Sequence, residues 1–204
     1  MTKIKICGLT RAEDIMAVNR HLPDYVGFVF AASRRQTKPE QARRLKAGLD
    51  SRIKVVGVFV NEPLDNIASL CGAGIIDLVQ LHGDESRDYI QALKEKIACP
   101  VIKAVRVQNP EQILEAQEMC SDLLLLDTHQ PGQYGGSGQT FDWGLIPELH
   151  KPFFLAGGLE IGNIEEAIRE CHPFGVDVSS GVETAGFKDD NKIRQIIAVI
   201  RNIG

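Results

Sequence analysis

The sequence of 204 residues has no long apolar run and no excess of basic residues. No apolar stretch approaches the roughly 18 residues that a membrane-spanning helix needs, and the first residues lack the apolar segment of a secretory signal peptide. The net charge of −4 and the isoelectric point of about 5.8 leave no basic footprint for nucleic acid. We therefore expect no membrane partner and no nucleic-acid partner.

Cysteine is scarce and irregularly placed. The five cysteines are an odd number, no two have CxxC spacing, and His82 has no cysteine nearby. This spacing argues against a zinc site and favours free thiols in a reducing, cytoplasmic setting. The cysteines are Cys7, Cys71, Cys99, Cys120 and Cys171.

Apolar runs of strand length recur through the chain, with helical patterns between most of them. Strand ends return about every 24 residues, close to the smallest repeat of a (β/α)₈ barrel. Runs that are apolar throughout indicate a parallel sheet covered by helices. The runs end at Cys7, Phe30, Val60, Leu81, Val105, Asp127, Ala156 and Val178, and the helical patterns include 11–22, 38–49, 64–71, 86–97, 109–120 and 189–203.

These patterns predict an α/β fold, a single small (β/α)₈ barrel spanning residues 1–204 as one domain. A doubly wound open sheet is the alternative, but it usually has fewer strands, and "CGLT" after the first strand is not the GxGxxG turn often found there. The sixth connection, "THQPGQYGGSGQTFDW", is long and Gly-rich with little room for a full helix. A loop of this kind in a minimal barrel is more often functional than filler.

Polar residues gather where the predicted strands end, which in a barrel is the functional rim. Asp127 follows four leucines, a poor place for a core residue and a good one for proton transfer. Arginine suits a carboxylate or a phosphate because its guanidinium is a planar fork. The predicted rim comprises Cys7, Ser33, Arg34, Arg35, Asn61, Gln80, Arg106, Asp127, Gly157, Gly158, Ser179, Ser180 and Gly181.

Two adjacent loops at the end of the chain are rich in small residues. "LAGGLEIGNIEEAI" is a strand, two glycines and a helix, and "VDVSSGVET" is a strand, Ser-Ser-Gly and a turn. Glycine lets backbone N–H groups approach an anion, and barrels often bind phosphate between the seventh and eighth loops. Tight turns would also favour glycine, but the two loops together predict a phosphate site.

With these residues in place, the chain resembles the phosphoribosylanthranilate isomerase family from end to end. The resemblance lies in "KICGLT", "YVGFVF", "VVGVFVN", "VQLHGDE", "LLLDT", "YGGSGQTFDW", "LAGGL" and "VDVSSGVE", in this order. It implies a cofactor-free barrel in tryptophan biosynthesis that acts on a phosphorylated small molecule. The reaction is an Amadori rearrangement of N-(5-phosphoribosyl)anthranilate to 1-(2-carboxyphenylamino)-1-deoxyribulose 5-phosphate.

The resemblance also implies roles for individual residues. Cys7 is similar to the family's general base, and Asp127 is similar to its general acid. The arginine for the anthranilate carboxylate falls at Arg35, although Ser33-Arg34-Arg35 departs from the usual Ser-Pro-Arg and leaves Arg34 as an alternative. The backbone at Gly157, Gly158, Ser180 and Gly181 would hold the phosphate.

The setting of Cys7 raises two further expectations. Gly8 should leave space for a ligand beside the thiol, and nearby cationic or N–H groups should lower the pKa of Cys7. The sequence leaves the assembly open between a monomer and a homodimer.

Three other functions compete with this interpretation. Indole-glycerol-phosphate synthase uses lysine, but Lys103 lies within the fifth predicted strand and not at its end. Sugar-phosphate epimerases commonly need His and Asp metal ligands, and "LHGDE" offers one His beside two acids that look like surface residues of a loop. A redox-sensing barrel would need a resolving thiol near Cys7, and no other cysteine lies at a strand end.

Overall fold

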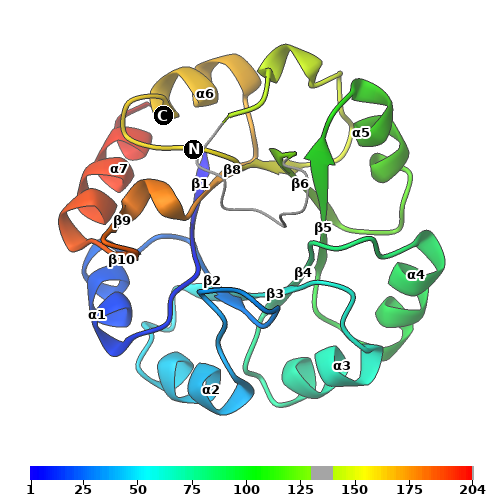
Figure 1. The fold of residues 1–204 in the computed structure, drawn as a ribbon, viewed down its shortest axis with the longest axis horizontal. Helices are drawn as coiled ribbons and strands as arrows, with labels where there is room; N and C mark the ends of the chain where they lie inside the picture. Colours follow the sequence, from blue (N-terminus) through cyan, green and yellow to red (C-terminus); the bar gives the residue numbers. More distant parts are fainter. Residues whose placement is uncertain (130–139, 204) are drawn as a thin grey trace.

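A computed structural model describes residues 1–129 and 140–203 of the chain. Within these residues, eight parallel strands form a closed barrel in chain order, because β1 pairs with both β2 and β8 (Figure 1). The strands are β1 (Lys3–Cys7), β2 (Tyr25–Val29), β3 (Lys54–Phe59), β4 (Leu78–Leu81), β5 (Val101–Val107), β6 (Leu123–Thr128), β7 (Phe153–Leu155) and β8 (Gly175–Val178). The predicted barrel is confirmed, and closure excludes the open doubly wound sheet.

The helices form a ring around this barrel (Figure 1). They are α1 (Ala12–His21), α2 (Pro39–Ala47), α3 (Leu64–Gly72), α4 (Arg87–Lys96), α5 (Pro110–Gln117), α6 (Ile164–Cys171) and α7 (Asp190–Ile203). Short 3₁₀ turns η1 (Trp143–Leu145) and η2 (Ser180–Val182) follow β6 and β8, and β9 (Glu183–Thr184) pairs with β10 (Phe187–Lys188). Most of the predicted Gly-rich sixth loop, residues 130–139, lies outside the described residues.

Local sequence explains where several helices begin. Ser86 accepts a hydrogen bond from the Tyr89 backbone N–H and caps α4, and Asn109 does the same for Gln112 at α5. Pro110 occupies the first turn of α5, where the missing N–H costs nothing. The predicted fifth helix was too long, because α5 ends at Gln117 and leaves Cys120 beyond it.

The main hydrophobic core lies between the strands and the helices. In α7, the residues Ile193, Ile196, Ile197 and Ile200 are all buried, at helical spacing along one face. Each buried isoleucine contributes roughly 1.5–3 kcal/mol, so this face fixes α7 against the barrel. Across the described residues, no helix is long and apolar enough to cross a bilayer.

The strand pattern predicts an interior that is apolar throughout. The structure differs, because the barrel interior also holds charged side chains. A small apolar cluster that includes Val56, Leu125 and Phe154 stands apart from the main core. Ile4 and Ile6 of β1 belong to the main core between the strands and the helices. Because side chains alternate along a strand, the residues next to them in β1 point into the barrel. Lys5 is one of them and is fully buried, where it pairs with Asp177 at 2.7 Å. The interior therefore holds charged groups close to the rim.

Candidate active site

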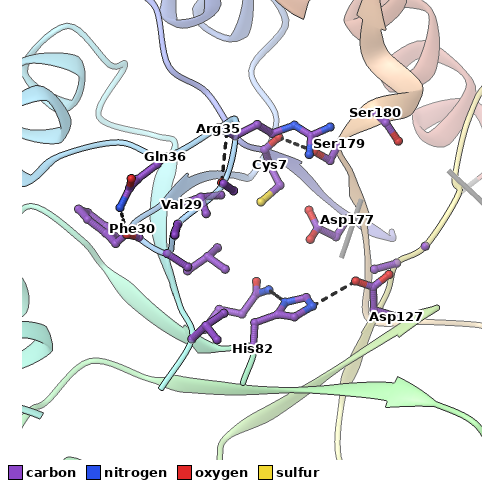
Figure 2. Close-up of a pocket in the computed structure, with 18 of the residues that line it drawn as sticks. Cys7, Val29, Phe30, Arg35, Gln36, His82, Asp127, Asp177, Ser179 and Ser180 are labelled. Carbon is purple, nitrogen blue, oxygen red and sulfur yellow. Dashed lines mark hydrogen bonds and ion pairs between the residues drawn. The ribbon is translucent and has the colours of Figure 1, made fainter. Parts of the chain in front are cut away.

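A cavity of about 500 Å³ opens among residues that end or follow strands of the barrel (Figure 2). Its lining includes Cys7, Arg35, His82, Asp127, Gly158 and Ser180. Six of the eight strands, or the loops that follow them, contribute these residues. Four predicted rim residues lie outside the lining: Arg34, Asn61, Arg106 and Gly181. Arg106 pairs with Asp84 at 2.6 Å, and Asn61 accepts a hydrogen bond from the Asp84 backbone N–H.

Cys7 ends β1 with its thiol buried beside β2. A Cβ on the paired residue Gly27 would lie 2.5 Å from Cys7 Sγ, so the glycine in "YVGFVF" makes room for the sulfur. Burial raises the pKa of the Cys7 thiol, and Asp177 adds to this effect. Lys5 and Lys188 act in the opposite direction but do not outweigh burial. The expectation of a lowered Cys7 pKa was therefore wrong, because it counted the nearby cations and not the desolvation.

Gly8 has a different neighbour from the one expected. Its φ of +84° favours glycine, and a Cβ there would collide with Arg35 Cδ. The space beside Gly8 is therefore filled by an arginine side chain, and the interpretation of Gly8 as direct clearance for a ligand was wrong. The missing side chain at Gly8 allows Arg35 to pack over this position and reach Glu183.

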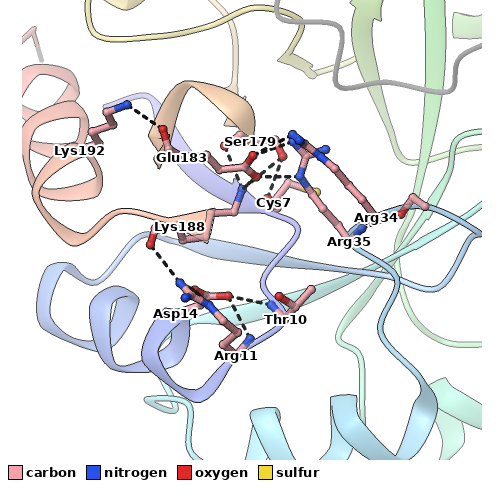
Figure 3. Close-up of polar contacts among 11 residues, drawn as sticks. Cys7, Thr10, Arg11, Asp14, Arg34, Arg35, Ser179, Glu183, Lys188 and Lys192 are labelled. Atoms are coloured by element: carbon pink, nitrogen blue, oxygen red, sulfur yellow. Dashed lines mark hydrogen bonds and ion pairs between the residues drawn. The ribbon is translucent and has the colours of Figure 1, made fainter. Parts of the chain in front are cut away.

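Arg35 and Arg34 converge on one carboxylate, Glu183 (Figure 3). Arg35 Nε lies 2.7 Å from Glu183 Oε1 and Arg35 Nη2 lies 3.0 Å from Oε2, while Arg34 Nη2 lies 2.9 Å from Oε2. Lys188 donates to Oε1 at 2.8 Å. Burial works against ionisation of Glu183, but Arg35 and Lys188 outweigh it and lower the pKa of the carboxyl group.

The two arginines differ in exposure. The Arg34 side chain is 60% exposed and lies outside the cavity lining, whereas the Arg35 side chain is 15% exposed and lines the cavity. The geometry therefore places Arg35, rather than Arg34, where it can contact a ligand.

Asp127 lies opposite an unexpected neighbour. Its Oδ1 accepts a hydrogen bond from the Thr128 backbone N–H at 2.8 Å, and its Oδ2 lies 3.2 Å from His82 Nε2. Asp127 and His82 are both buried in the wall of the cavity (Figure 2). The motif "LHGDE" predicts a loop beside β4 and gives no role to His82, whereas the structure directs the His82 ring toward Asp127, the proposed acid.

The last residue of "LHGDE", Glu85, is the partner of Lys103, the lysine considered for a synthase-like reaction. Glu85 is 5% exposed and pairs with Lys103 at 2.7 Å, and Lys103 also donates to the Gly83 carbonyl oxygen. The view of Glu85 as a surface acid was therefore wrong. Lys103 is not among the described residues that line the cavity, so the structure does not support lysine-based chemistry by Lys103. Within residues 1–129 and 140–203, no three His, Cys, Asp or Glu side chains group as metal ligands.

The two small-residue loops meet beside the cavity. Gly157 and Gly158 have φ of +84° and +60°, and a Cβ on Gly157 would collide with Thr128 Oγ1. A Cβ on Gly181 would collide with the Leu159 carbonyl oxygen, so Gly181 serves loop packing and does not line the cavity. Gly157, Gly158 and Ser180 do line it.

The sequence did not identify four residues of the site: Lys5, His82, Asp177 and Glu183. Lys5 and Asp177 lie in strands that were interpreted as apolar, and Glu183 follows the Ser-Ser-Gly turn without a motif of its own. The only available signal was period 2 in β1, which places Lys5 on the same side as Cys7.

The fold and the cavity define a (β/α)₈-barrel enzyme with a thiol, a carboxyl group and an arginine around one small-molecule site. The family model described as "N-(5'phosphoribosyl)anthranilate (PRA) isomerase" matches residues 4–199. The chain belongs to this family of isomerases, which act in tryptophan biosynthesis. The predicted family and isomerase activity are confirmed.

Individual relatives agree over their whole length. N-(5'-phosphoribosyl)anthranilate isomerase of Endomicrobium trichonymphae is 51% identical over 203 residues and covers 100% of both chains. A structure of generated monomers of the dimeric isomerase from Thermotoga maritima has a TM-score of 0.84 at 36% identity, covering 99% of this chain and 100% of that one. A structure of the isomerase in complex with reduced 1-(o-carboxyphenylamino)-1-deoxyribulose 5-phosphate has a TM-score of 0.83, 36% identity and the same coverage.

Proposed function

We propose that this chain converts N-(5-phosphoribosyl)anthranilate to 1-(2-carboxyphenylamino)-1-deoxyribulose 5-phosphate in the cavity at the rim, with Cys7 as general base and Asp127 as general acid. The observation that carries the proposal is that Cys7, Arg35 and Asp127, which come from three separate segments, line one cavity. A relative of known structure binds the reduced product, which carries the same carboxylate and phosphate.

The chemistry needs one proton donor and one proton acceptor. Asp127 gives a proton to the ring oxygen as the C1–O bond breaks and the nitrogen lone pair forms an iminium ion. The Cys7 thiolate then removes the proton from C2, and the resulting enaminol takes a proton at C1 and loses its hydroxyl proton to become the ketone. The substrate is isomerised with no net gain or loss of protons, so the residues need no cofactor to complete the reaction.

The ends of the substrate carry two anions, and the rim offers a place for each. Arg35 would bind the anthranilate carboxylate through its planar guanidinium. The backbone at Gly157, Gly158, Ser180 and Gly181 would hold the phosphate. Of these four residues, Gly181 does not line the cavity, and its close packing against the Leu159 carbonyl oxygen requires a glycine there.

The remaining features of the proposal concern the whole protein. Residues 1–204 would act as one barrel domain in the cytoplasm, with a phosphorylated small molecule as the partner. The dimeric relative from Thermotoga maritima keeps both a monomer and a homodimer open for this chain.

The test is turnover by the purified protein in a buffer that contains a metal chelator. N-(5-phosphoribosyl)anthranilate is supplied, and the change in anthranilate fluorescence reports its conversion. Cys7→Ala and Asp127→Asn serve as matched variants, with folding checked by circular dichroism. We expect turnover by the wild type and severe losses in both variants. A folded wild type without turnover, or variants that match it, would refute the proposal.

A further inference from the structure

His82 has a buried ring nitrogen that the proposed chemistry has not yet used. The residue is 7% exposed and follows β4 at the edge of the cavity. Its Nδ1 lies 2.8 Å from Gln80 Nε2, whereas its Nε2 makes no aligned hydrogen bond within the described residues. The nearest acid to Nε2 is Asp127, whose Oδ2 is 3.2 Å away. A buried polar nitrogen that faces a catalytic carboxyl group calls for a physical reason.

Lys5 settles which ring nitrogen carries the proton. An ammonium group only donates hydrogen bonds, so the side-chain atom of Gln80 that lies 2.9 Å from Lys5 Nζ must be its oxygen. The Gln80 NH₂ group therefore faces His82 Nδ1 and donates to it. Nδ1 must then carry a lone pair, and the proton of the neutral ring lies on Nε2.

The charge of Lys5 is itself well supported. Burial disfavours the ammonium form, but Asp177 and Cys7 outweigh this effect and raise the pKa of Lys5. The chain of contacts therefore runs from Asp177 through Lys5 and Gln80 to His82, and each link orients the next. Gln80 is 1% exposed, so water does not compete for its amide.

We propose that His82 is a positioning residue for the isomerisation, held by Lys5 and Gln80 in the Nε2–H tautomer so that it presents a fixed donor to Oδ2 of Asp127. This inference rests on the proposed role of Asp127. When Asp127 gives up its proton, it becomes a buried carboxylate. Its Oδ1 already accepts from Thr128, and a small rotation of His82 supplies the donor for Oδ2.

The opposite tautomer would act against the reaction. With the proton on Nδ1, the lone pair of Nε2 would face the new carboxylate, and the two would repel each other. The Gln80 amide would also direct its N–H group at another N–H group. The His82 tautomer is therefore fixed by Lys5 and Gln80 in the barrel interior before the substrate binds.

The first test reads the tautomer directly and needs no turnover. Protein labelled with ¹⁵N-histidine is examined by long-range ¹H–¹⁵N correlation at neutral pH, and the signals missing in His82→Gln identify His82. His150→Gln, a change at an exposed ring outside the cavity, is the matched control. We expect Nε2 to be protonated in the wild type and the proton to shift to Nδ1 in Gln80→Glu, whose carboxylate accepts instead of donating. A wild-type ring with its proton on Nδ1 would overturn the proposal, even if Gln80→Glu does not fold.

The second test separates kcat from KM. His82→Leu should lower kcat by about 10- to 100-fold, less than the about 10²- to 10³-fold for a donor that touches the reacting oxygen itself. Its KM should change by less than about threefold, because His82 acts through Asp127 and not through the anionic ends of the substrate. His82→Gln places an amide donor near the position of Nε2 and should recover kcat to within about tenfold of wild type.

The outcomes distinguish this inference from the proposed function. An active wild type with unchanged kcat in His82→Leu would overturn the role of His82 alone. A rise in KM at constant kcat would also overturn it, since the ring would then bind substrate. A wild type without turnover would refute the proposed function and, with it, the role of His82 in catalysis, while the tautomer would still be measured.

Discussion

Arg35→Ala should raise KM strongly while leaving the fold intact. The Arg35 side chain lines the cavity and makes two contacts with Glu183, at 2.7 and 3.0 Å. Removing it does not strand the Glu183 carboxylate, because Arg34 and Lys188 still donate to it. The substitution therefore avoids the penalty of a buried unpaired charge.

The size of the expected rise in KM follows from the contacts of Arg35 in the free protein and in the substrate complex. In the free protein the Arg35 guanidinium already pairs with Glu183. When the substrate binds, its carboxylate either replaces Glu183 at the guanidinium or shares the guanidinium with it. The net loss on truncation is then that of hydrogen bonds to a charged group, about 1.5–3 kcal/mol. At about 1.4 kcal/mol per tenfold, this corresponds to a rise of about 10- to 150-fold in KM. Arg34→Ala should raise KM by less than about threefold, because its side chain is 60% exposed and surface ion pairs contribute little.

The assay compares KM and kcat of Arg35→Ala, Arg34→Ala and wild type by anthranilate fluorescence, with thermal unfolding as the control for stability. Arg35→Lys adds a graded variant, since lysine keeps the charge and loses the planar fork. The result that would refute the reasoning is a larger rise in KM for Arg34→Ala than for Arg35→Ala. The carboxylate site would then lie one residue earlier in the loop.

Three further predictions test the other parts of the site. Inorganic phosphate should inhibit competitively, and Gly158→Asp should weaken that inhibition because it adds a negative charge beside the proposed phosphate loops; an unchanged inhibition constant in the folded variant would exclude this location. Because burial raises the pKa of Cys7 above the ordinary value of 9.0, the thiolate fraction should increase only at alkaline pH, so alkylation of Cys7 by iodoacetamide, followed by peptide mass spectrometry, should have a midpoint above 9.0 and not below it. Asp127→Asn should lose about 10²- to 10⁴-fold in kcat, the usual contribution of a general acid, and activity within tenfold of wild type across a pH series would contradict that role.

The sequence predicted what depends on local patterns. The ends of β1 and β6 at Cys7 and Asp127 could be located from apolar runs of strand length, and β1 ends at Cys7 as predicted while β6 extends one residue beyond Asp127. The alternation of strands and helices then placed both residues on the same rim. Such inferences need only neighbours along the chain and the geometry of a barrel.

The sequence could not predict pairings between distant segments. Glu183 lies 148 residues from Arg35, and Gln80 lies 75 residues from Lys5. The pKa of Cys7 was misjudged for the same reason, since its direction depends on burial by the assembled barrel and on Asp177 at the far end of the chain. A motif shows that a cation is present, but only the fold shows how much water remains around the thiol.

The charge of the rim gives a physical reason why it suits a substrate with two anionic ends. The guanidinium of arginine carries a positive charge in proteins. Arg34 and Arg35 together face the single carboxylate of Glu183. This leaves an excess of one positive charge even when Lys188, whose pKa burial lowers, is left out of the count. A second carboxylate can therefore join Arg35 without first displacing Glu183. Glu183 would then hold the guanidinium in place before the substrate arrives, and less conformational entropy is lost on binding.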